Sequence, residues 1–309
     1  LASGEALIRV AGLARKQAHR RPIVVVSAIG QTTDILADAS ELAIGGQVEE
    51  AQQRVAAIRD VLEKTAGAVL VDASLLAGML VSSVDDMSQL LCDLSVATTH
   101  ERHSVIDSLL SYGERMSSLV MTWLLQQQGS NAVHVDAREV LVTDDRFTEA
   151  APLYGPTNDR LRELVLPLCD AGRIVVLGGF IGRTLDGRAS TLGRGGSDLT
   201  ASVVGAGVDA EEIQIWTDVD GVMTADPAMV PEAKRLPRLS FTEASELAYF
   251  GGRVLHPSTV GPAVGKNIPV RVLNSLKSDI EGTLIVAENQ LPTLTVKSIV
   301  HKEGISVID

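Results

Sequence analysis

The feature that most constrains the fold is an apolar run, Ile174–Leu177, that ends in Gly178 and Gly179. β-Branched residues bounded by glycines are typical of a buried parallel strand. A polar excursion from Arg183 to Ala189 follows and suggests a hairpin or flap. A glycine-rich turn then opens into an amphipathic helix at Asp198. A buried strand joined to a helix in this way predicts an α/β fold.

The turn at residues 193–198 predicts an anion-binding site. Glycines let backbone N–H groups point at an anion, and a helix N-terminus adds partial positive charge. Arg194 and Asp198 place a cation and a carboxylate beside the same small volume. The simpler alternative is that Ser197 or Asp198 caps the helix while the glycines only turn the chain. The embedded Arg194 and Asp198 favour a phosphate or carboxylate site.

Further strands end in loops of small polar residues. Residues 23–26 form a short apolar run that leads through Ser27 and Thr33 into a helix over 34–44. Strands alternating with helices predict a three-layer αβα sandwich with a mostly parallel central sheet. The carboxyl edge of such a sheet is where open α/β folds bind ligands. Thr33 and Asp34 either cap the helix or contact a ligand, and the sequence leaves both open.

Residues 49–128 are almost wholly helical by pattern. We expect residues 112–118 to interrupt this run, because Gly113 precedes an acid–base pair, Glu114 and Arg115, and a glycine inside a helix is unfavourable. The alternative is an exposed Glu–Arg pair on a solvated helix face. His100 and His103 lack a second pair of ligands, so we predict no metal site formed by protein side chains.

Composition excludes several classes of function. The formal net charge of −12 argues against a nucleic-acid surface and favours a small-molecule protein. We find no apolar run of about 18 residues and therefore expect no membrane span. The isolated Cys92 and Cys169 suit a reducing cytoplasm.

The common nucleotide and hydrolase motifs are absent. The sequence has no P-loop, no dinucleotide-binding G-x-G-x-x-G after a strand, and no nucleophile elbow. What remains is several strand-end loops that hold Gly, Thr, Asp and Arg. Such loops suit phosphoryl transfer by positioning and charge neutralisation, which needs no covalent nucleophile.

Five segments of the chain stand out together. The most specific is Thr-Leu-Gly-Arg-Gly-Gly-Ser-Asp at 191–198, and the others are residues 113–117, 179–182, 216–221 and 250–257. Together they resemble the aspartate kinases (aspartokinases) of the amino-acid kinase superfamily, in the expected order and over nearly the whole chain.

The resemblance implies transfer of the γ-phosphate of ATP, with Mg²⁺, to the side-chain carboxylate of L-aspartate. The product would be 4-phospho-L-aspartate, in the first step of lysine, threonine, methionine and isoleucine biosynthesis. It also implies an allosteric, cytoplasmic enzyme. One rival is another superfamily member acting on glutamate, acetylglutamate, carbamate or UMP. The second rival is a regulatory subunit that binds ligand without turnover.

The resemblance also implies the site residues. Arg194 would clamp a substrate carboxylate bidentately, and Glu114 and Asp198 would face the substrate ammonium. The remaining substrate-side positions are Thr33, Gly195 and Ser197. The nucleotide-side positions are Thr217, Asp218, Gly221, Met223, Asp226, Arg253 and Val254, with Arg253 near the phosphates or base.

Four departures from the family pattern stand out. The family begins with a strand and a Lys-Phe-Gly-Gly-Thr-Ser loop, and this chain starts just after the place where that loop is expected. Met223 stands where the family often has tyrosine, Ala228 where it has arginine, and Arg253 where it often has lysine. Arg253 keeps the positive charge of the family's lysine, whereas Met223 and Ala228 weaken the expected nucleotide contacts.

The expected domains follow the family. Residues 1–290 would form the catalytic domain, with a substrate lobe over about 1–189 and a nucleotide lobe over 190–290. Residues 291–309 would begin an ACT-type α+β regulatory domain that is truncated here. The family expectation is a homo-oligomer formed through that ACT region, with feedback control by an end-product amino acid.

Overall fold

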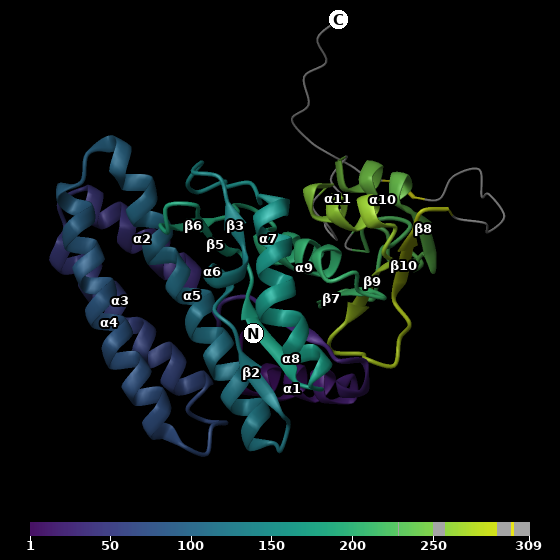
Figure 1. Cartoon of the computed structure of the whole chain (residues 1–309), viewed down its shortest axis with the longest axis horizontal. Helices are drawn as coiled ribbons and strands as arrows, with labels where there is room; N and C mark the ends of the chain where they lie inside the picture. The colour runs from purple at the N-terminus through teal and green to yellow at the C-terminus, as the bar shows by residue number, and fades with distance from the viewer. Residues whose placement is uncertain (228, 250–256, 289–297, 300–309) are drawn as a thin grey trace, which may run out of the picture. The chain divides into compact units, whose positions relative to one another are not determined.

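The computed structural model describes residues 1–227, 229–249, 257–288 and 298–299 (Figure 1). The chain divides into two compact units, Leu1–Thr200 and Ala201–Asp309. The boundary falls within helix α9 (Gly196–Gly207), so the glycine-rich turn belongs to the first unit.

The first unit is rich in helices and holds two small sheets. Its helices are α1 (Gly4–Lys16), α2 (Thr32–Ile44), α3 (Val48–Thr65), α4 (Ala73–Val96), α5 (Thr99–Gln127), α6 (Ala137–Val140), α7 (Tyr154–Arg160) and α8 (Leu166–Asp170). A 3₁₀ turn, Ala18–Arg20, follows α1, and a π-helical stretch, Leu161–Val165, joins α7 to α8. Its strands are β1 (Ile23–Val26), β2 (Ala132–His134), β3 (Val142–Thr143), β4 (Ile174–Gly178), β5 (Ile181–Thr184) and β6 (Ala189–Thr191).

Strand β4 is the centre of the first sheet, whose order is β1-β4-β2 with both pairings parallel. Every residue of β4 is buried. Since successive side chains of a strand point to opposite faces, both faces of this strand are covered. Helices α5 and α8 both contact β4. The predicted buried parallel strand is therefore confirmed.

The first unit has a second sheet of order β3-β5-β6, whose strands β5 and β6 follow β4 in the chain. β5 and β6 pair antiparallel from Ile181↔Thr191 to Arg183↔Ala189, which confirms the predicted hairpin. This hairpin delivers the chain to the glycine-rich turn that precedes α9.

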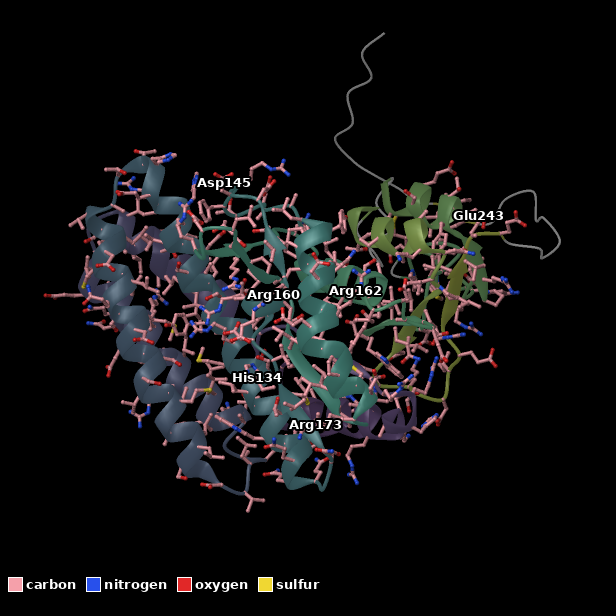
Figure 2. The ribbon with its side chains drawn as sticks, in the orientation of Figure 1. His134, Asp145, Arg160, Arg162, Arg173 and Glu243 are labelled. Carbon is pink, nitrogen blue, oxygen red and sulfur yellow. The ribbon has the colours of Figure 1, made fainter. Side chains whose placement is uncertain are left out.

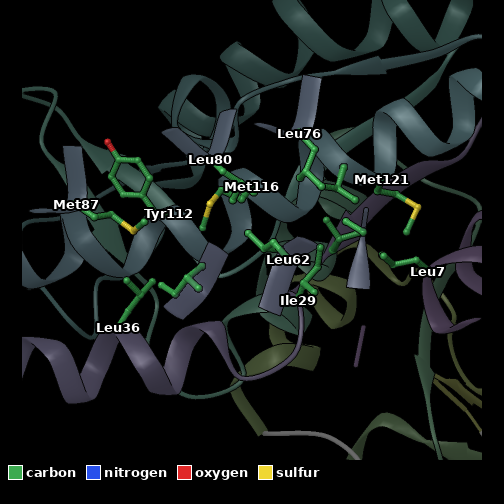
Figure 3. Packing of buried hydrophobic residues seen from close by; sticks show 14 of the residues in the cluster. Leu7, Ile29, Leu36, Leu62, Leu76, Leu80, Met87, Tyr112, Met116 and Met121 are labelled. Atoms are coloured by element: carbon green, nitrogen blue, oxygen red, sulfur yellow. The ribbon is translucent and has the colours of Figure 1, made fainter. Parts of the chain in front are cut away.

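The hydrophobic core of the first unit lies among helices α1 to α5 (Figure 3). α2, α3, α4 and α5 pack against one another, and α1 packs on α5. Only 3% of the chain is aromatic, so leucine, valine, alanine and methionine fill this core. Fully or almost fully buried members include Leu7, Ile29, Leu36, Leu62, Leu80 and Met121.

Helix α5 is continuous through Gly113, so the expected interruption at residues 112–118 is wrong. Gly113 lies in the middle of the helix because it packs tightly: a Cβ there would lie 3.0 Å from the Ala28 Cβ. The tertiary contact offsets the cost of about 1 kcal/mol that an interior glycine brings to a helix. Glu114 therefore projects from a helix centre and not from a helix start.

Helix α4 corrects the expectation that no stretch is long and apolar enough for a membrane span. Ser74–Val96 meets that criterion by length and composition, with a mean hydropathy of 1.2. However, the helix is amphipathic, because Leu80, Met87 and Leu91 are fully buried in the core while Asp85 and Asp93 are exposed. One face of α4 therefore packs in the core and the other is exposed, with 28% of the apolar window buried.

Within its described residues, the second unit contains one sheet and a helix pair. Its elements after α9 are β7 (Ile213–Thr217), β8 (Arg238–Ser240), α10 (Phe241–Tyr249), α11 (Pro257–Lys266), β9 (Val270–Asn274) and β10 (Thr283–Val286). The strand order is β7-β9-β10-β8, and only β9 and β10 pair antiparallel. Ile215, Val272 and Ile285 are among the residues that build a separate core.

Five of the seven pairings among the described strands are parallel, which confirms an α/β fold with mostly parallel strands. The described strands are hydrogen-bonded in three groups, and the parallel group β1-β4-β2 supplies the predicted central sheet of the first unit. The expected ACT-type segment at 291–309 lies outside the described residues except for Ser298 and Ile299.

Adjacent positions on α4 provide a matched test of this packing. Leu80→Ala should lower the free energy of unfolding by about 2–5 kcal/mol, because it removes a fully buried side chain and leaves a cavity. Val81 is 52% exposed, so Val81→Ala should change the free energy of unfolding by less than about 0.5 kcal/mol. Urea unfolding followed by circular dichroism measures both. Equal losses for the two variants would contradict the assigned orientation of α4.

Candidate functional site

A pocket of about 300 Å³ lies in the first unit at the carboxyl ends of β1 and β4. Four segments of the chain meet there: the loop after β1, the first turn of α2, the middle of α5, and the stretch from Phe180 to the start of α9. The lining residues are Ser27, Thr33, Glu114, Phe180, Gly193, Gly195, Gly196, Ser197 and Asp198.

Glu114 is the most buried polar residue of the pocket, at 3% exposure. Its Oε1 accepts a hydrogen bond from the backbone N–H of Ala28 over 3.2 Å. Its Oε2 is buried without a hydrogen-bond partner. Burial raises the pKa of Glu114 to about 7, against the opposing effect of the Ala28 N–H. An uncompensated buried carboxylate is costly, so this oxygen is suited to a cationic or hydrogen-bond-donating ligand.

Asp198 lies in the first turn of α9 and provides the second carboxylate. Burial raises the pKa of Asp198 as well. The described residues that line the pocket include these two acids and no cationic side chain. Two desolvated carboxylates that face one small volume favour a positively charged group, such as an ammonium.

Close backbone contacts define the floor of the pocket. A Cβ at Gly179 would lie 2.7 Å from the Ser197 Cα, so only glycine lets the end of β4 approach the start of α9. Ser27, directly after β1, donates from Oγ to Ser197 Oγ over 2.9 Å. Gly193 and Gly195 have φ values of 70° and 73°, which glycine adopts without strain. The glycines therefore shape the turn for close approach of backbone atoms.

The structure brings together most of the predicted substrate-side residues: Thr33, Glu114, Gly195, Ser197 and Asp198 all line the pocket. Thr33 and Asp34 lie inside α2, whose N-cap is Gln31, so neither caps the helix. Arg194 is exposed and lies between two lining glycines, and it is not itself among the lining residues. It therefore belongs to the rim of the pocket.

The predicted nucleotide-side residues lie in the second unit, beginning where β7 ends. Thr217 Oγ1 donates to Asp218 Oδ1 over 3.1 Å. Asn274, at the end of β9, donates from Nδ2 to the Asp218 carbonyl oxygen over 3.2 Å and to Asp220 Oδ1 over 2.6 Å. Lys277 donates to Asp220 Oδ2 over 3.0 Å. The parallel neighbour β9 thus holds the turn in place.

Gly221 continues this turn with a φ of 129°, and a Cβ there would lie 2.5 Å from Thr283 Oγ1. Met223 forms an isolated antiparallel bridge, and the backbone of Asp226 accepts hydrogen bonds from the following turn. Arg253, Val254 and Ala228 lie outside the described residues.

Several site residues were missed by sequence reasoning. Ser27 and Phe180 directly follow predicted strands, and that position was the available signal. Asn274 and Lys277 carry no motif, and only the pairing of β7 with β9 brings them to the Asp218 turn.

The described part of the chain holds no group of three or more His, Cys, Asp or Glu side chains arranged to bind a metal ion. His134 on β2, a partly buried histidine, lies beside Ser118, with Nε2 3.0 Å from the hydroxyl (Figure 2). Burial lowers the pKa of His134.

Comparison with known proteins places residues 3–274 within a family model described as the amino acid kinase family. Aspartokinase 2, chloroplastic, of Arabidopsis thaliana is 36% identical over 314 residues, covering 99% of this chain and 56% of the relative. The chain thus spans little more than half the length of that relative.

Solved structures agree with the sequence comparison. Escherichia coli aspartokinase III, in complex with aspartate and ADP in the R-state, superposes with a TM-score of 0.85 at 33% identity. The match covers 94% of this chain and 63% of that one. The complex of E. coli aspartokinase III with lysine and aspartate in the T-state gives a TM-score of 0.83 at 34% identity, with the same coverage.

Glu114 makes the stability of the protein depend on pH. Its pKa of about 7 in the folded chain exceeds the ordinary value of 4.5, so the folded state binds the proton more tightly than the unfolded state. Its contribution is present below pH 4.5 and is lost as the pH rises through 7. In the ligand-free protein, we compare the free energy of unfolding of Glu114→Gln with that of wild type. This difference should shift by about 2 to 3 kcal/mol in favour of Glu114→Gln when the pH rises from 5 to 8.

Urea unfolding at the two pH values measures this gain. Glu41→Gln, at an exposed glutamate of α2, controls for the loss of one carboxylate. A gain in Glu114→Gln no larger than in the control would contradict the burial of an ionisable Glu114.

Proposed function

Because the chain belongs to the amino acid kinase family, we propose that it is an aspartate kinase. The reaction would transfer the γ-phosphoryl group of MgATP to the side-chain carboxylate of L-aspartate and give 4-phospho-L-aspartate. The names of the relatives support this substrate, and so does the ligand set of the E. coli R-state structure, aspartate and ADP.

The observation that carries the proposal is the pair of desolvated carboxylates in the pocket. Glu114 Oε2 is buried without a partner, and Asp198 shares the pocket with it. An α-ammonium group supplies three N–H donors and a full positive charge, which together satisfy both acids. This contact would fix the amino-acid end of the substrate and leave its side chain free to react.

The α-carboxylate of the substrate would bind on the opposite side of the pocket. Arg194 lies between two lining glycines, Gly193 and Gly195, and its planar guanidinium can hold a carboxylate bidentately. The N-terminus of α9 adds partial positive charge. Thr33 and Ser197 contribute hydroxyl groups to the same pocket. Since Arg194 is exposed at the rim, it would close over the substrate on binding.

The chemistry needs no general base, because the side chain of aspartate is ionised at neutral pH. The difficulty is to bring two anions together, and charge neutralisation must offset their repulsion. Magnesium enters as part of the MgATP substrate and neutralises phosphate charge there. The turn at Thr217 and Asp218, held by Asn274, would bind the nucleotide. Gly221, Met223, Asp226, Arg253 and Val254 complete the proposed nucleotide side.

The proposed setting of the enzyme also follows its relatives. We propose a homo-oligomer with feedback control by an end-product amino acid, which the lysine complex of E. coli aspartokinase III supports by analogy. The low cysteine content supports a cytoplasmic location as part of this proposal. The Arabidopsis relative, by contrast, is named chloroplastic.

The proposal is tested by incubating the protein with MgATP, L-aspartate and hydroxylamine, which traps an acyl phosphate as its hydroxamate. L-Glutamate and N-acetyl-L-glutamate serve as comparison substrates. Aspartyl hydroxamate should form fastest. Equal or faster turnover of glutamate would assign the chain to another branch of the family. ATP binding without any hydroxamate would favour a regulatory subunit.

Replacing Arg194 tests the proposed clamp. Arg194→Ala should raise the KM for aspartate and lower kcat together, for a loss of about 100-fold in kcat/KM, because it removes a charge-assisted contact used throughout the reaction. Arg173→Ala is the control, since Arg173 is an exposed arginine just before β4 and outside the pocket lining (Figure 2). Unchanged kinetics in Arg194→Ala would refute the clamp.

The pKa of Glu114 predicts how aspartate binding varies with pH. The ionised acid is the form that pairs with an ammonium, so binding below pH 7 must first expel a proton. The KM for aspartate should rise by up to about tenfold per pH unit below pH 7 and level off above it. In Glu114→Gln this dependence should vanish and the KM should be high throughout. Initial rates between pH 5.5 and 8.5 measure both profiles, and a flat profile in wild type would exclude this role.

A further inference from the structure

We infer that Asp107 is a positioning residue for the aspartate clamp, and that it acts by holding the chain segment that carries Arg194. This inference rests on the proposed function of the pocket. The sequence offered no motif at Asp107, which lies inside helix α5. The hydrogen bonds of its side chain point to the role.

Asp107 is fully buried and accepts from three donors in two other segments of the chain. Its Oδ2 accepts from the backbone N–H of Thr191 over 2.8 Å and from that of Thr148 over 2.9 Å. Its Oδ1 accepts from the Thr191 hydroxyl over 2.7 Å, and the Thr148 N–H also reaches it over 3.1 Å. Both carboxylate oxygens are therefore satisfied by groups remote in sequence.

These contacts hold the chain segment that leads to Arg194, the proposed carboxylate clamp. Thr191 ends β6, and only two residues separate it from Arg194. Thr148 has a φ of 72°, a strained value for a β-branched residue. Gly193 packs against this same residue, because a Cβ at Gly193 would lie 3.1 Å from the Thr148 carbonyl oxygen. Asp107 thus ties down both the chain that leads to Arg194 and the strained loop on which that chain rests.

The position of Asp107 on α5 gives the contacts a functional meaning. Asp107 precedes Glu114 by seven residues, which is two helical turns, so both side chains leave the same face of α5. One carboxylate faces the proposed ammonium site and the other holds the segment that carries Arg194. Helix α5 therefore sets the spacing between the two ends of the substrate pocket.

A carboxylate is the only side chain of this size that can accept from all three donors. Burial raises the pKa of Asp107, and the bonds from Thr148 and Thr191 oppose that rise. An asparagine would keep the shape but turn an N–H₂ group toward at least one N–H donor. The substitution Asp107→Asn therefore releases the segment without leaving a cavity.

The test measures kinetics of the full chain in the hydroxamate assay. Asp107→Asn should raise the KM for aspartate about tenfold while the KM for ATP changes less than twofold. The decisive step repeats the substitution in an Arg194→Ala background. If Asp107 acts through Arg194, then Asp107→Asn should change the aspartate KM of the Arg194→Ala variant by less than twofold. If the increases in aspartate KM of the two single variants multiply in the double variant, the inference is overturned and general destabilisation is indicated.

Two controls separate positioning from folding. Leu109→Ala removes a fully buried core side chain two residues away on α5, so it should lower stability without raising the aspartate KM. Thr191→Val removes only the hydroxyl contact and should raise the aspartate KM a few-fold, whereas Thr191→Ser keeps the hydroxyl and should restore it. This pair decides the matter if Asp107→Asn fails to fold. Equal KM values for the two Thr191 variants would overturn the inference.

A readout independent of activity distinguishes the two proposals. In Asp107→Asn, hydrogen exchange should speed up at the amides of Thr148 and Thr191, with the amides of α4 unchanged. Wild-type protein that forms no aspartyl hydroxamate would refute the proposed function and, with it, the assignment of Asp107 to a clamp. Normal wild-type turnover with unchanged exchange and KM in Asp107→Asn would refute the inference about Asp107 alone.

Discussion

The packing of helix α5 against the carboxyl ends of β1 and β4 is the constraint on which the pocket depends. Gly113 lets the helix approach Ala28, and Gly178 lets β4 approach the helix, since a Cβ at Gly178 would lie 2.9 Å from the Glu114 Cβ. This close approach buries the Glu114 carboxylate between two strand ends. The burial that raises the pKa of Glu114 therefore depends on these two glycines.

Burial removes three acids of the first unit from solvent. Glu114 and Asp198 are desolvated in the pocket, and Asp107 is desolvated beneath it. Both oxygens of Asp107 accept hydrogen bonds from Thr148 and Thr191, whereas one oxygen of Glu114 is left unpaired. The difference separates a structural carboxylate from one poised for a ligand, because an unsatisfied buried charge lowers the stability of the free protein and is relieved on binding.

Much of this arrangement follows from local sequence. Short apolar runs predicted β1 and β4, and the polar excursion at Arg183–Ala189 predicted the hairpin. The glycine-rich turn before α9 predicted a ligand site, and five of the six predicted substrate-side residues line one pocket. The strand and hairpin predictions succeed because apolar runs and the turns between them carry short-range signals, whereas the ligand site stays a prediction.

Contacts between distant segments decided the rest. The sequence predicted a break at Gly113, yet α5 runs through it, since packing on Ala28 outweighs the local cost of glycine. No pattern marked Asp107 or Asn274, whose partners lie more than 40 residues away. The sequence by itself determined the alternation of elements, the family to which the chain belongs and the residue types of the site. Only the tertiary structure decided which carboxylates lose their solvent, because desolvation depends on every segment that packs around a side chain and not on its neighbours in sequence.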